Sequence, residues 1–352
     1  MSRPDFHATR GAVGLTAAAA LLLAGCSSSG STSGSGGVPK TLAEALREVH
    51  AGAATTDALA WGQYGGANAN ALGQILTPIL GFSVTQQPFV LTVGRAPNWV
   101  SVLSGTFDPA AIGAKLQALG YKSTDRGGGV TQWLIRDDHQ IDVNQQPEEL
   151  AATVDTFNVI RVSRTRIEFG GATADLDAAL AGKSPSLADD PVVGAIAKCL
   201  DKDTSGLYDA ATYQLAVGTG ANGTESICVA APDDATAKQY GAAFTKAITT
   251  GTSQVTLEPW SKLFSTPKVE SLGGKAHVMR LTVTDVDPAH PRLANTMLDN
   301  AVVELIGKPT PTGRPRTGSP SPTDTPTNSP TDTPTDTPTD SPTDSPTDSP
   351  TT

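Results

Sequence analysis

The chain has 352 residues, a net charge of −10 and three cysteines. When the two ends of biased composition are set aside, about 270 residues remain, enough for a substantial folded body. This body carries a charge of −7 and has no basic stripe, so nucleic acid is excluded as an expected partner, as is docking on anionic lipid through charge.

The N-terminus has the layout of a secretory signal peptide. Arg3 and Arg10 form a basic head, and an apolar run rich in Ala and Leu follows over residues 11–24. This run is too short to span a hydrocarbon core, which needs about 20 residues. We therefore expect residues 1–25 to be a signal peptide rather than a membrane-spanning anchor.

The apolar run ends in Leu23-Ala24-Gly25-Cys26, which resembles the lipobox of bacterial lipoproteins at every position. The resemblance implies that the Cys26 thiol takes a diacylglyceryl group and becomes the new N-terminus. It also implies that the protein is held by lipid at the extracytoplasmic face of the cell membrane. The alternative is an ordinary signal peptide that ends at a chance cysteine.

The residues after Cys26 have the composition of a leash. Residues 27–37 are all Ser, Gly or Thr, which cannot bury apolar surface and form a flexible coil. We expect residues 26–39 to be a lipidated flexible spacer that keeps a folded body, residues 40–308, away from the bilayer.

The first half of the body, about residues 40–170, alternates helix and strand signals. Thr41 and Glu44 form a capping box before an apolar stripe. Residues 89–94 and 99–104 read as paired strands. A helix is then predicted from Asp108-Pro109 to Gly120, and a further strand over residues 130–135.

The second half, about residues 205–308, repeats this plan. Strands are predicted at 213–218 and 225–231, joined by the hairpin signal Ala221-Asn222-Gly223. A helix follows from Asp233 to Gly251, and then a strand over 277–283, which is similar in sequence to Val159–Val162 of the first half. The expected fold class is α+β, with two similar halves that each lay a helix on an antiparallel sheet.

A helical segment joins the halves and carries a cysteine. One helix contains Leu176 and Leu180, and the other starts at Asp190-Pro191 and ends near Cys199. With Cys26 used by lipid, Cys199 and Cys228 are left as an even pair in an exported body, so we expect a disulfide. Two buried thiols are the alternative.

The C-terminal segment, residues 309–352, repeats Pro, Thr, Ser and Asp with a period of four. A proline in each unit prevents a helix or a central strand. We expect a disordered, extended and acidic tail, either unmodified or carrying sugars on its hydroxyl groups.

Few residues have the pattern of a site. Trp61 and Tyr64, in a Gly-rich stretch, are candidates for a binding surface, with core packing as the stronger interpretation. The sequence Asp137-Asp138-His139, with Asp142 after it, has metal-binding side chains but fits a solvated turn better. Neither a catalytic residue nor a metal or cofactor is predicted.

The body also resembles a group of uncharacterised lipoproteins from high-GC Gram-positive (actinobacterial) bacteria. The similar segments lie across most of residues 40–308: Val102–Asp108, Leu119-Gly120-Tyr121, Trp133, Ser186–Asp190, Cys199-Leu200, Gly251 and Pro259-Trp260-Ser261. This resemblance implies no activity and no catalytic residues, only the lipid on Cys26.

The sequence therefore favours a lipid-anchored, non-catalytic binding or interaction module of the cell envelope. Its partner would be an envelope protein, a cell-wall polymer or a small molecule. Two alternatives remain open: an envelope hydrolase whose active-site residues are dispersed along the chain, and a solute-binding protein of a transporter.

Overall fold

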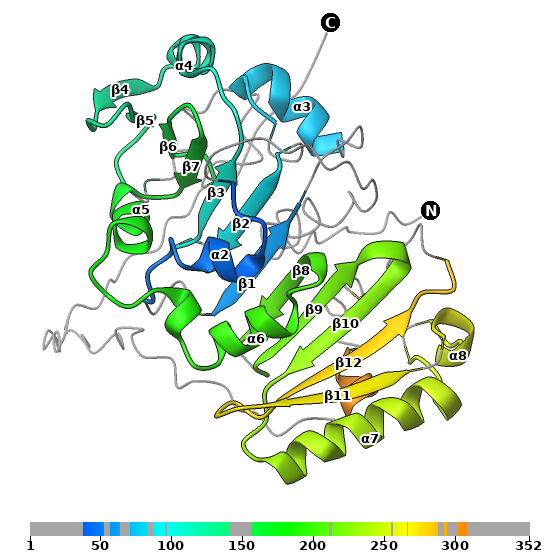
Figure 1. Cartoon of the computed structure of the whole chain (residues 1–352). Coiled ribbons are helices and arrows are strands. Elements are labelled where there is room, and N and C mark those ends of the chain that lie inside the picture. Colours follow the sequence, from blue (N-terminus) through cyan, green and yellow to red (C-terminus); the bar gives the residue numbers. More distant parts are fainter. Residues whose placement is uncertain are drawn as a thin grey trace, which may run out of the picture. The chain divides into compact units, whose positions relative to one another are not determined.

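The computed structural model of the chain (Figure 1) describes most of the predicted body. The described residues are 38–52, 57–63, 71–83, 87–95, 97–138, 140, 156–210, 213–254, 256–265, 267–287, 292–293 and 302–307. The expected signal peptide, the spacer up to residue 37 and the C-terminal tail lie outside these residues. Among the residues described, no helix has both the length and the apolar character needed to cross a bilayer.

One twelve-stranded sheet organises the body, in the order β11-β12-β10-β9-β8-β1-β2-β3-β7-β6-β5-β4. All of its strand pairs are antiparallel. The predicted α+β class is confirmed. The expectation of a separate sheet in each half is wrong, because hydrogen bonds between β1 (Ala58–Gly62) and β8 (Asp203–Asp209) join the halves into a single sheet.

The joint between the halves is packed by a tryptophan. Trp61 on β1 lies opposite Gly206 on β8 and is only 1% exposed. A Cβ atom on residue 206 would collide with the indole ring, so glycine is required there. β1 and β8 are the first strands of their respective halves, and they pair antiparallel.

The first half continues with β2 (Phe89–Val93), β3 (Val100–Ser104) and the helix α4 (Pro109–Ala118), close to the predicted bounds. Asp108 caps α4 by accepting the N–H groups of Ala110 and Ala111, and Gly120 ends it at φ +91°. The remaining elements are β4 (Lys122–Asp125), β5 (Thr131–Leu134), β6 (Val159–Val162), β7 (Arg166–Gly170), and the helices α2 (Leu42–Leu46) and α3 (Ala71–Leu80).

The second half shares part of this order, namely three strands followed by a helix and further strands, but it has fewer strands and its first two strands are not separated by a helix like α3. β9 (Leu215–Gly220) and β10 (Thr224–Val229) form the predicted hairpin, with Asn222 in the left-handed conformation at its turn. After it come α7 (Asp234–Thr250), α8 (Trp260–Leu263), β11 (Lys268–Gly273), β12 (Val278–Thr284) and α10 (Val302–Ile306). β12 lies beside β10, the third strand of its half, as β7 lies beside β3. β12 therefore corresponds to β7, although its sequence is similar to that of β6.

Helices cover both faces of the sheet, because strand residues alternate between two apolar cores. On β2, Val90 belongs to the core under α3, α4, α7, α8 and α10, which we call face A. Phe89, Leu91 and Val93 belong to the core under α2, α5 (Thr173–Leu180) and α6 (Val193–Cys199), which we call face B. In Figure 1, α2 and α6 cross the near side of the sheet.

The connecting segment is fastened to face B by a disulfide. Cys199 ends α6 and Cys228 lies on β10, with Cα atoms 6.1 Å apart, so the predicted pairing is confirmed. Both cysteines are fully buried. The bond therefore clamps the helix that precedes β8 onto the sheet of the second half, as the sequence predicts.

Candidate functional site

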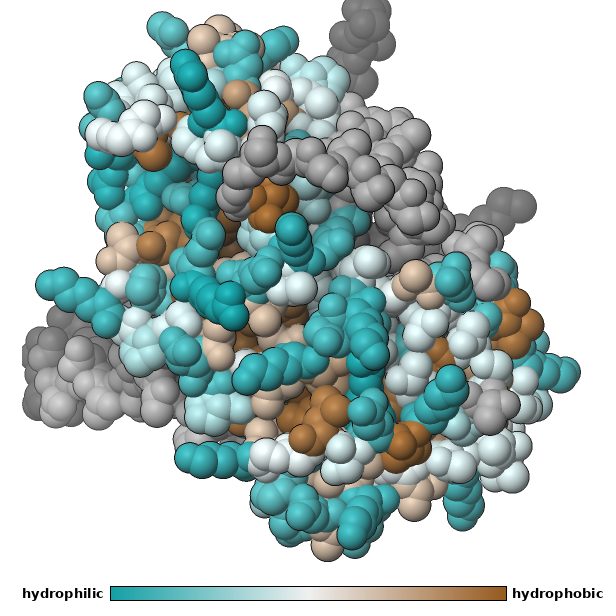
Figure 2. Space-filling model, viewed as in Figure 1, coloured by the Kyte–Doolittle hydropathy of each residue, from teal (hydrophilic) through white to brown (hydrophobic). Residues whose placement is uncertain are grey.

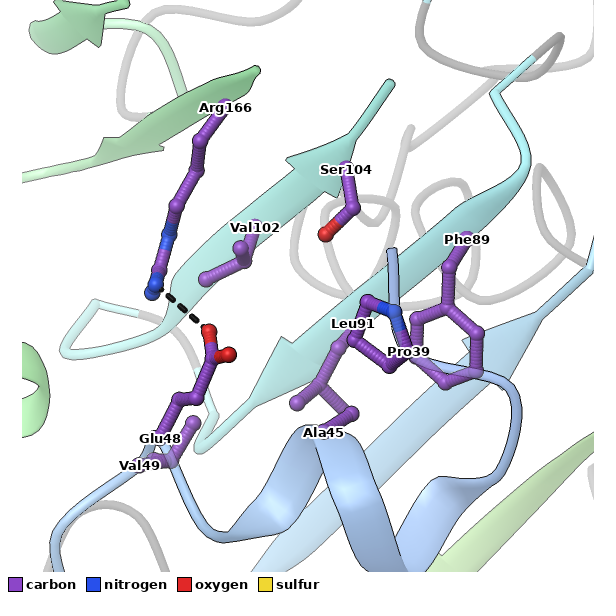
Figure 3. Close-up of a pocket in the computed structure, with 9 residues that line it drawn as sticks. All are labelled: Pro39, Ala45, Glu48, Val49, Phe89, Leu91, Val102, Ser104 and Arg166. Atoms are coloured by element: carbon purple, nitrogen blue, oxygen red, sulfur yellow. Dashed lines mark hydrogen bonds and ion pairs between the residues drawn. The ribbon is translucent and has the colours of Figure 1, made fainter. Parts of the chain in front are cut away.

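A shallow groove lies on face B of the first half (Figure 3). The space that it encloses is about 10 Å³, which is room for about one water molecule. Its floor and walls are apolar, and its rim is polar: Pro39, Ala45, Val49, Phe89, Leu91 and Val102 line the inside, with Glu48, Ser104 and Arg166 around it. Pockets that enclose small molecules usually measure about 300–1,000 Å³, so this groove can offer a surface contact but cannot enclose a solute.

The position of the groove follows from local structure. Phe89, Leu91, Val102 and Ser104 point to face B because they hold every second position on β2 and β3. Ala45 and Val49 are four residues apart and so lie on one side of α2 and the turn that follows it. The short α2, held by its Thr41 cap, therefore forms one wall of the groove.

Arg166 fixes the polar rim of the groove. Its Nη1 lies 2.7 Å from Glu48 Oε2, as Figure 3 shows, and its Nε lies 2.8 Å from Glu168 Oε1. The Arg166 side chain is about a quarter exposed. The rim thus presents a paired guanidinium and carboxylate, which can exchange partners with an incoming polar group.

The Arg166 pairs belong to a longer network on face B. Glu168 Oε2 lies 3.9 Å from Arg161 Nη1, and Arg161 Nη2 lies 2.5 Å from Asp177 Oδ1 on α5. Arg126 pairs with the same Asp177 oxygen at 2.8 Å. Arg161 is the most deeply buried cation of the network, and its Nε donates to Gln132 Oε1. Positive and negative groups alternate, so the network balances its own charge.

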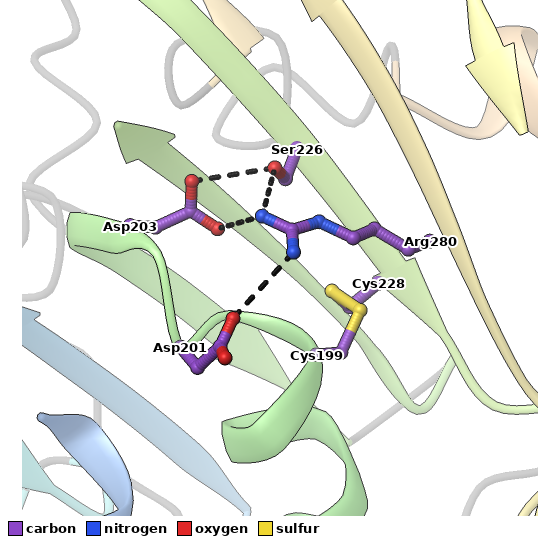
Figure 4. Close-up of a disulfide and its surroundings, with 6 residues drawn as sticks. All are labelled: Cys199, Asp201, Asp203, Ser226, Cys228 and Arg280. Atoms are coloured by element: carbon purple, nitrogen blue, oxygen red, sulfur yellow. Dashed lines mark hydrogen bonds and ion pairs between the residues drawn. A yellow bond between two sulfur atoms is a disulfide. The ribbon is translucent and has the colours of Figure 1, made fainter. Parts of the chain in front are cut away.

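A second polar cluster lies beside the disulfide (Figure 4). Asp203 Oδ1 accepts a hydrogen bond from the Ser226 hydroxyl, and Arg280 reaches Asp201 at 3.5 Å and Asp203 at 3.7 Å. Burial raises the pKa of Asp203 to about 7, although Arg280 opposes this shift. The cluster holds the chain after Cys199 on the sheet, and the Arg280 guanidinium occupies the space between the two acids.

The predicted aromatic surface is not formed by Trp61. The ring is buried at the joint of the halves, where it packs in the face B core. The candidate surface is therefore wrong for Trp61, because burial of a large apolar ring is favoured over exposure. Tyr64 lies outside the described residues.

Asp138, one of the candidate metal-binding residues, caps a helix. Asp138 accepts the N–H groups of Thr173 and Ala174 at 2.7 and 3.1 Å, and so caps α5 from a distant loop. His139 and Asp142 lie outside the described residues. No group of three or more His, Cys, Asp or Glu side chains in the described ranges is placed to hold a metal ion.

The two histidines that the structure describes have different partners. His50 Nδ1 is 2.6 Å from the carbonyl oxygen of Ser184. His277 Nδ1 is 2.7 Å from Asp234 Oδ1 at the N-terminal end of α7. Each ring thus ties two segments of chain together.

Sequence reasoning missed the charged residues of both clusters. Arg161 stands in the apolar strand Val159–Val162, which was the one available signal. Asp203 and Glu225 look like ordinary acids at strand ends, and only the packed sheet buries them.

Comparison with models of protein families, with curated proteins and with solved structures finds no match.

Proposed function

We propose that the chain is an exported lipoprotein, anchored by lipid on Cys26, whose body is a non-catalytic binding module of the cell envelope. The observation that carries the anchor is the sequence Leu23-Ala24-Gly25-Cys26 behind a basic head and a short apolar run. The disulfide between the other two cysteines supports this proposal, because such bonds persist in oxidising compartments outside the cytosol.

The groove of face B supports the binding role. Pro39, at the point where the spacer meets the body, contributes to its lining, so a partner held there would sit close to the anchored end of the body. The groove offers an apolar floor beside the Arg166–Glu48 pair. Because the groove is too small to enclose a group, we infer that a partner lies across it and contacts its apolar floor and the Arg166–Glu48 pair.

The hydrophilic character of the surface around the groove favours a transient contact with a partner over a permanent one. Figure 2 shows that the face drawn is largely hydrophilic, with apolar residues gathered in small, separate patches. Permanent interfaces between proteins are larger and more apolar than transient ones. We therefore expect the partner, an envelope protein or a cell-wall polymer, to bind reversibly. The antiparallel sheet also favours this role over that of a solute-binding protein, because solute-binding proteins usually have parallel sheets.

The anchor is tested by metabolic labelling of the full chain with a palmitate analogue in a host that processes lipoproteins. The wild type is expected to take up the label and to sediment with membranes. The Cys26→Ala variant is expected to do neither. Equal labelling of the two proteins, or no labelling of the wild type, would contradict the anchor.

The groove is tested separately by photo-crosslinking in the same cells. A photoreactive residue in place of the exposed rim residue Glu48 is expected to yield a discrete adduct with an envelope component. The matched control places it at Lys246, exposed on α7. An adduct pattern that is the same at both positions would rule out the groove as the binding site.

A further inference from the structure

Two buried carboxyl groups lie together at one end of the second half. Glu225 stands at the start of β10, opposite Val283 of β12, and Asp285 follows β12 directly. Glu225 is 0% exposed, and the side chain of Asp285 is also 0% exposed. Their side chains interact with each other, out of contact with water.

Glu225 holds a separate piece of the chain against the sheet. Its two carboxyl oxygens accept the backbone N–H groups of Arg292 at 3.1 Å and Leu293 at 2.9 Å. Leu293 is fully buried in the face A core. We call Arg292 and Leu293 the latch segment, because Glu225 fastens them to the sheet.

Asp285 has one oxygen left open. Its Oδ1 accepts the N–H of Asp287 at 2.7 Å. Its Oδ2 lies 3.6 Å from Arg292 Nε and accepts no hydrogen bond from any residue that the structure describes. A buried carboxyl oxygen without a donor is unfavourable, so a proton placed between Glu225 and this oxygen would satisfy both groups.

The local charges require such a proton. Among the described residues, three carboxyl groups face this site, those of Glu225, Asp285 and Asp287, and Arg292 is the single cation that faces them. Two ionised carboxylates side by side repel each other strongly in a buried position. Burial raises the pKa of Glu225 to about 8, and burial likewise raises the pKa of Asp285.

We propose that Glu225 and Asp285 share one proton, donated by Glu225 to Asp285 Oδ2, and that this proton keeps the latch segment closed. When the proton leaves to solvent, two carboxylates and Asp287 face one guanidinium, and the latch segment opens. The groove and the lipid anchor play no part in this latch, so it stands independently of the proposed function.

The direction of the pH effect follows from the raised pKa of Glu225. In the closed latch Glu225 holds its proton. When the latch is open and Glu225 is hydrated, Glu225 loses this proton above its ordinary pKa of 4.5. Closure is therefore most favourable in acid, weakens as the pH rises from about 5 to about 8, and levels off above that range.

The test is hydrogen exchange of the full chain, because the amides of Arg292 and Leu293 are themselves the donors to Glu225. Protection is measured at pH 5, 6, 7 and 8 and corrected for the intrinsic exchange rate. The opening equilibrium of the latch segment is expected to rise about tenfold for each pH unit. In Glu225→Gln the protection should become nearly independent of pH, whereas the control Asp203→Asn, on face B, should keep the wild-type slope.

Infrared spectroscopy keeps the proposal testable if Glu225→Gln does not fold. Because Asp203 also has a raised pKa of about 7, the spectra are compared in the Asp203→Asn protein. At pH 6 this protein is expected to show a protonated carboxyl band that disappears towards pH 9 and that is reduced or shifted when Asp285→Asn is added. Constant protection of the latch segment in the wild type, an unchanged slope in Glu225→Gln, or the absence of a carboxyl band that titrates would each overturn the proposal.

Discussion

The two halves share part of their order of elements, yet they neutralise buried charge in different ways. In the first half, Arg161 and Arg166 lie against face B, and carboxylates from three other positions, Glu48, Glu168 and Asp177, pair with them. In the second half the buried charged groups are mainly acids. Asp203, Glu225 and Asp285 outnumber the cations that reach them, and burial raises the pKa of all three.

This difference shows that one architecture can bury ionisable groups either with a counter-charge or with a proton. Pairing requires the partner side chains to stay in place, so the first half should be sensitive to the loss of a partner. Proton binding makes stability depend on pH, so the second half should respond to alkali. The following changes separate these two behaviours, in order of decreasing effect.

The largest effect is expected for Arg161→Ala in the first half. Removing this guanidinium leaves Glu168 with Arg166 alone and Asp177 with Arg126 alone, and it removes the donor to the buried Gln132. Losing a buried cation, its ion pairs and the space it fills costs about 3 kcal/mol or more. Urea denaturation of the full chain measures the loss in the free energy of unfolding.

Arg126→Ala is the matched control, because Arg126 pairs with the same Asp177 oxygen from a more exposed position. An exposed pair contributes about 0–1 kcal/mol. Equal losses for the two variants would show that burial does not decide the strength of this network.

The disulfide comes next. Cys199 and Cys228 are separated by 29 residues, and closing such a loop is worth about 3 kcal/mol in the chain-entropy model. The double variant Cys199→Ala/Cys228→Ala should lose about this much stability in urea denaturation. Reductant should destabilise the wild type and leave the double variant unchanged, and a wild type indifferent to reductant would contradict a clamping role.

A smaller change is expected from the pH dependence of the second half, measured as the change in the free energy of unfolding per pH unit. Asp203 has a raised pKa of about 7 in the folded protein, so its contribution to stability is complete in acid and declines between about pH 4 and pH 7. Asp203→Asn is expected to reduce the slope of unfolding free energy against pH by up to about 1.4 kcal/mol per unit in that range. An unchanged slope between pH 5 and pH 7 would mean that Asp203 is ionised in the folded protein.

The smallest effect is expected for the cap on α5. Asp138→Ala removes the acceptor for the N–H groups of Thr173 and Ala174 and should cost about 1 kcal/mol. Its exposed neighbour provides the control, since Asp137→Ala should cost less than about 0.5 kcal/mol. Thermal unfolding distinguishes the two, and a larger loss for Asp137→Ala would argue against the capping role.

Local signals predicted the local structure well. Asp108 and Asp233 cap the helices that follow them, and Asn222 turns the hairpin, because each of these features depends on residues within a few positions. The disulfide was also predictable, since two cysteines were left after Cys26 was assigned to the lipid.

The assembly of the halves could not be predicted in the same way. β1 is buried along almost its whole length and lacks the alternation that marks a half-exposed strand, so the sequence did not place Trp61 at the joint of the halves. Its partner β8 pairs with it across about 150 residues of chain, from Ala58 to Asp209, a contact that no local pattern encodes. The raised pKa of Glu225 has the same origin, because its burial depends on the latch segment, which lies far away in the sequence.

The lipid anchor is tested most directly by the mass of the N-terminal peptide of the mature protein. We expect this peptide to begin at Cys26 and to be heavier than its sequence by a diacylglyceryl group, while the Cys26→Ala variant gives no lipid-modified peptide. A mature protein that begins elsewhere, or an unmodified Cys26 at the N-terminus, would contradict the anchor.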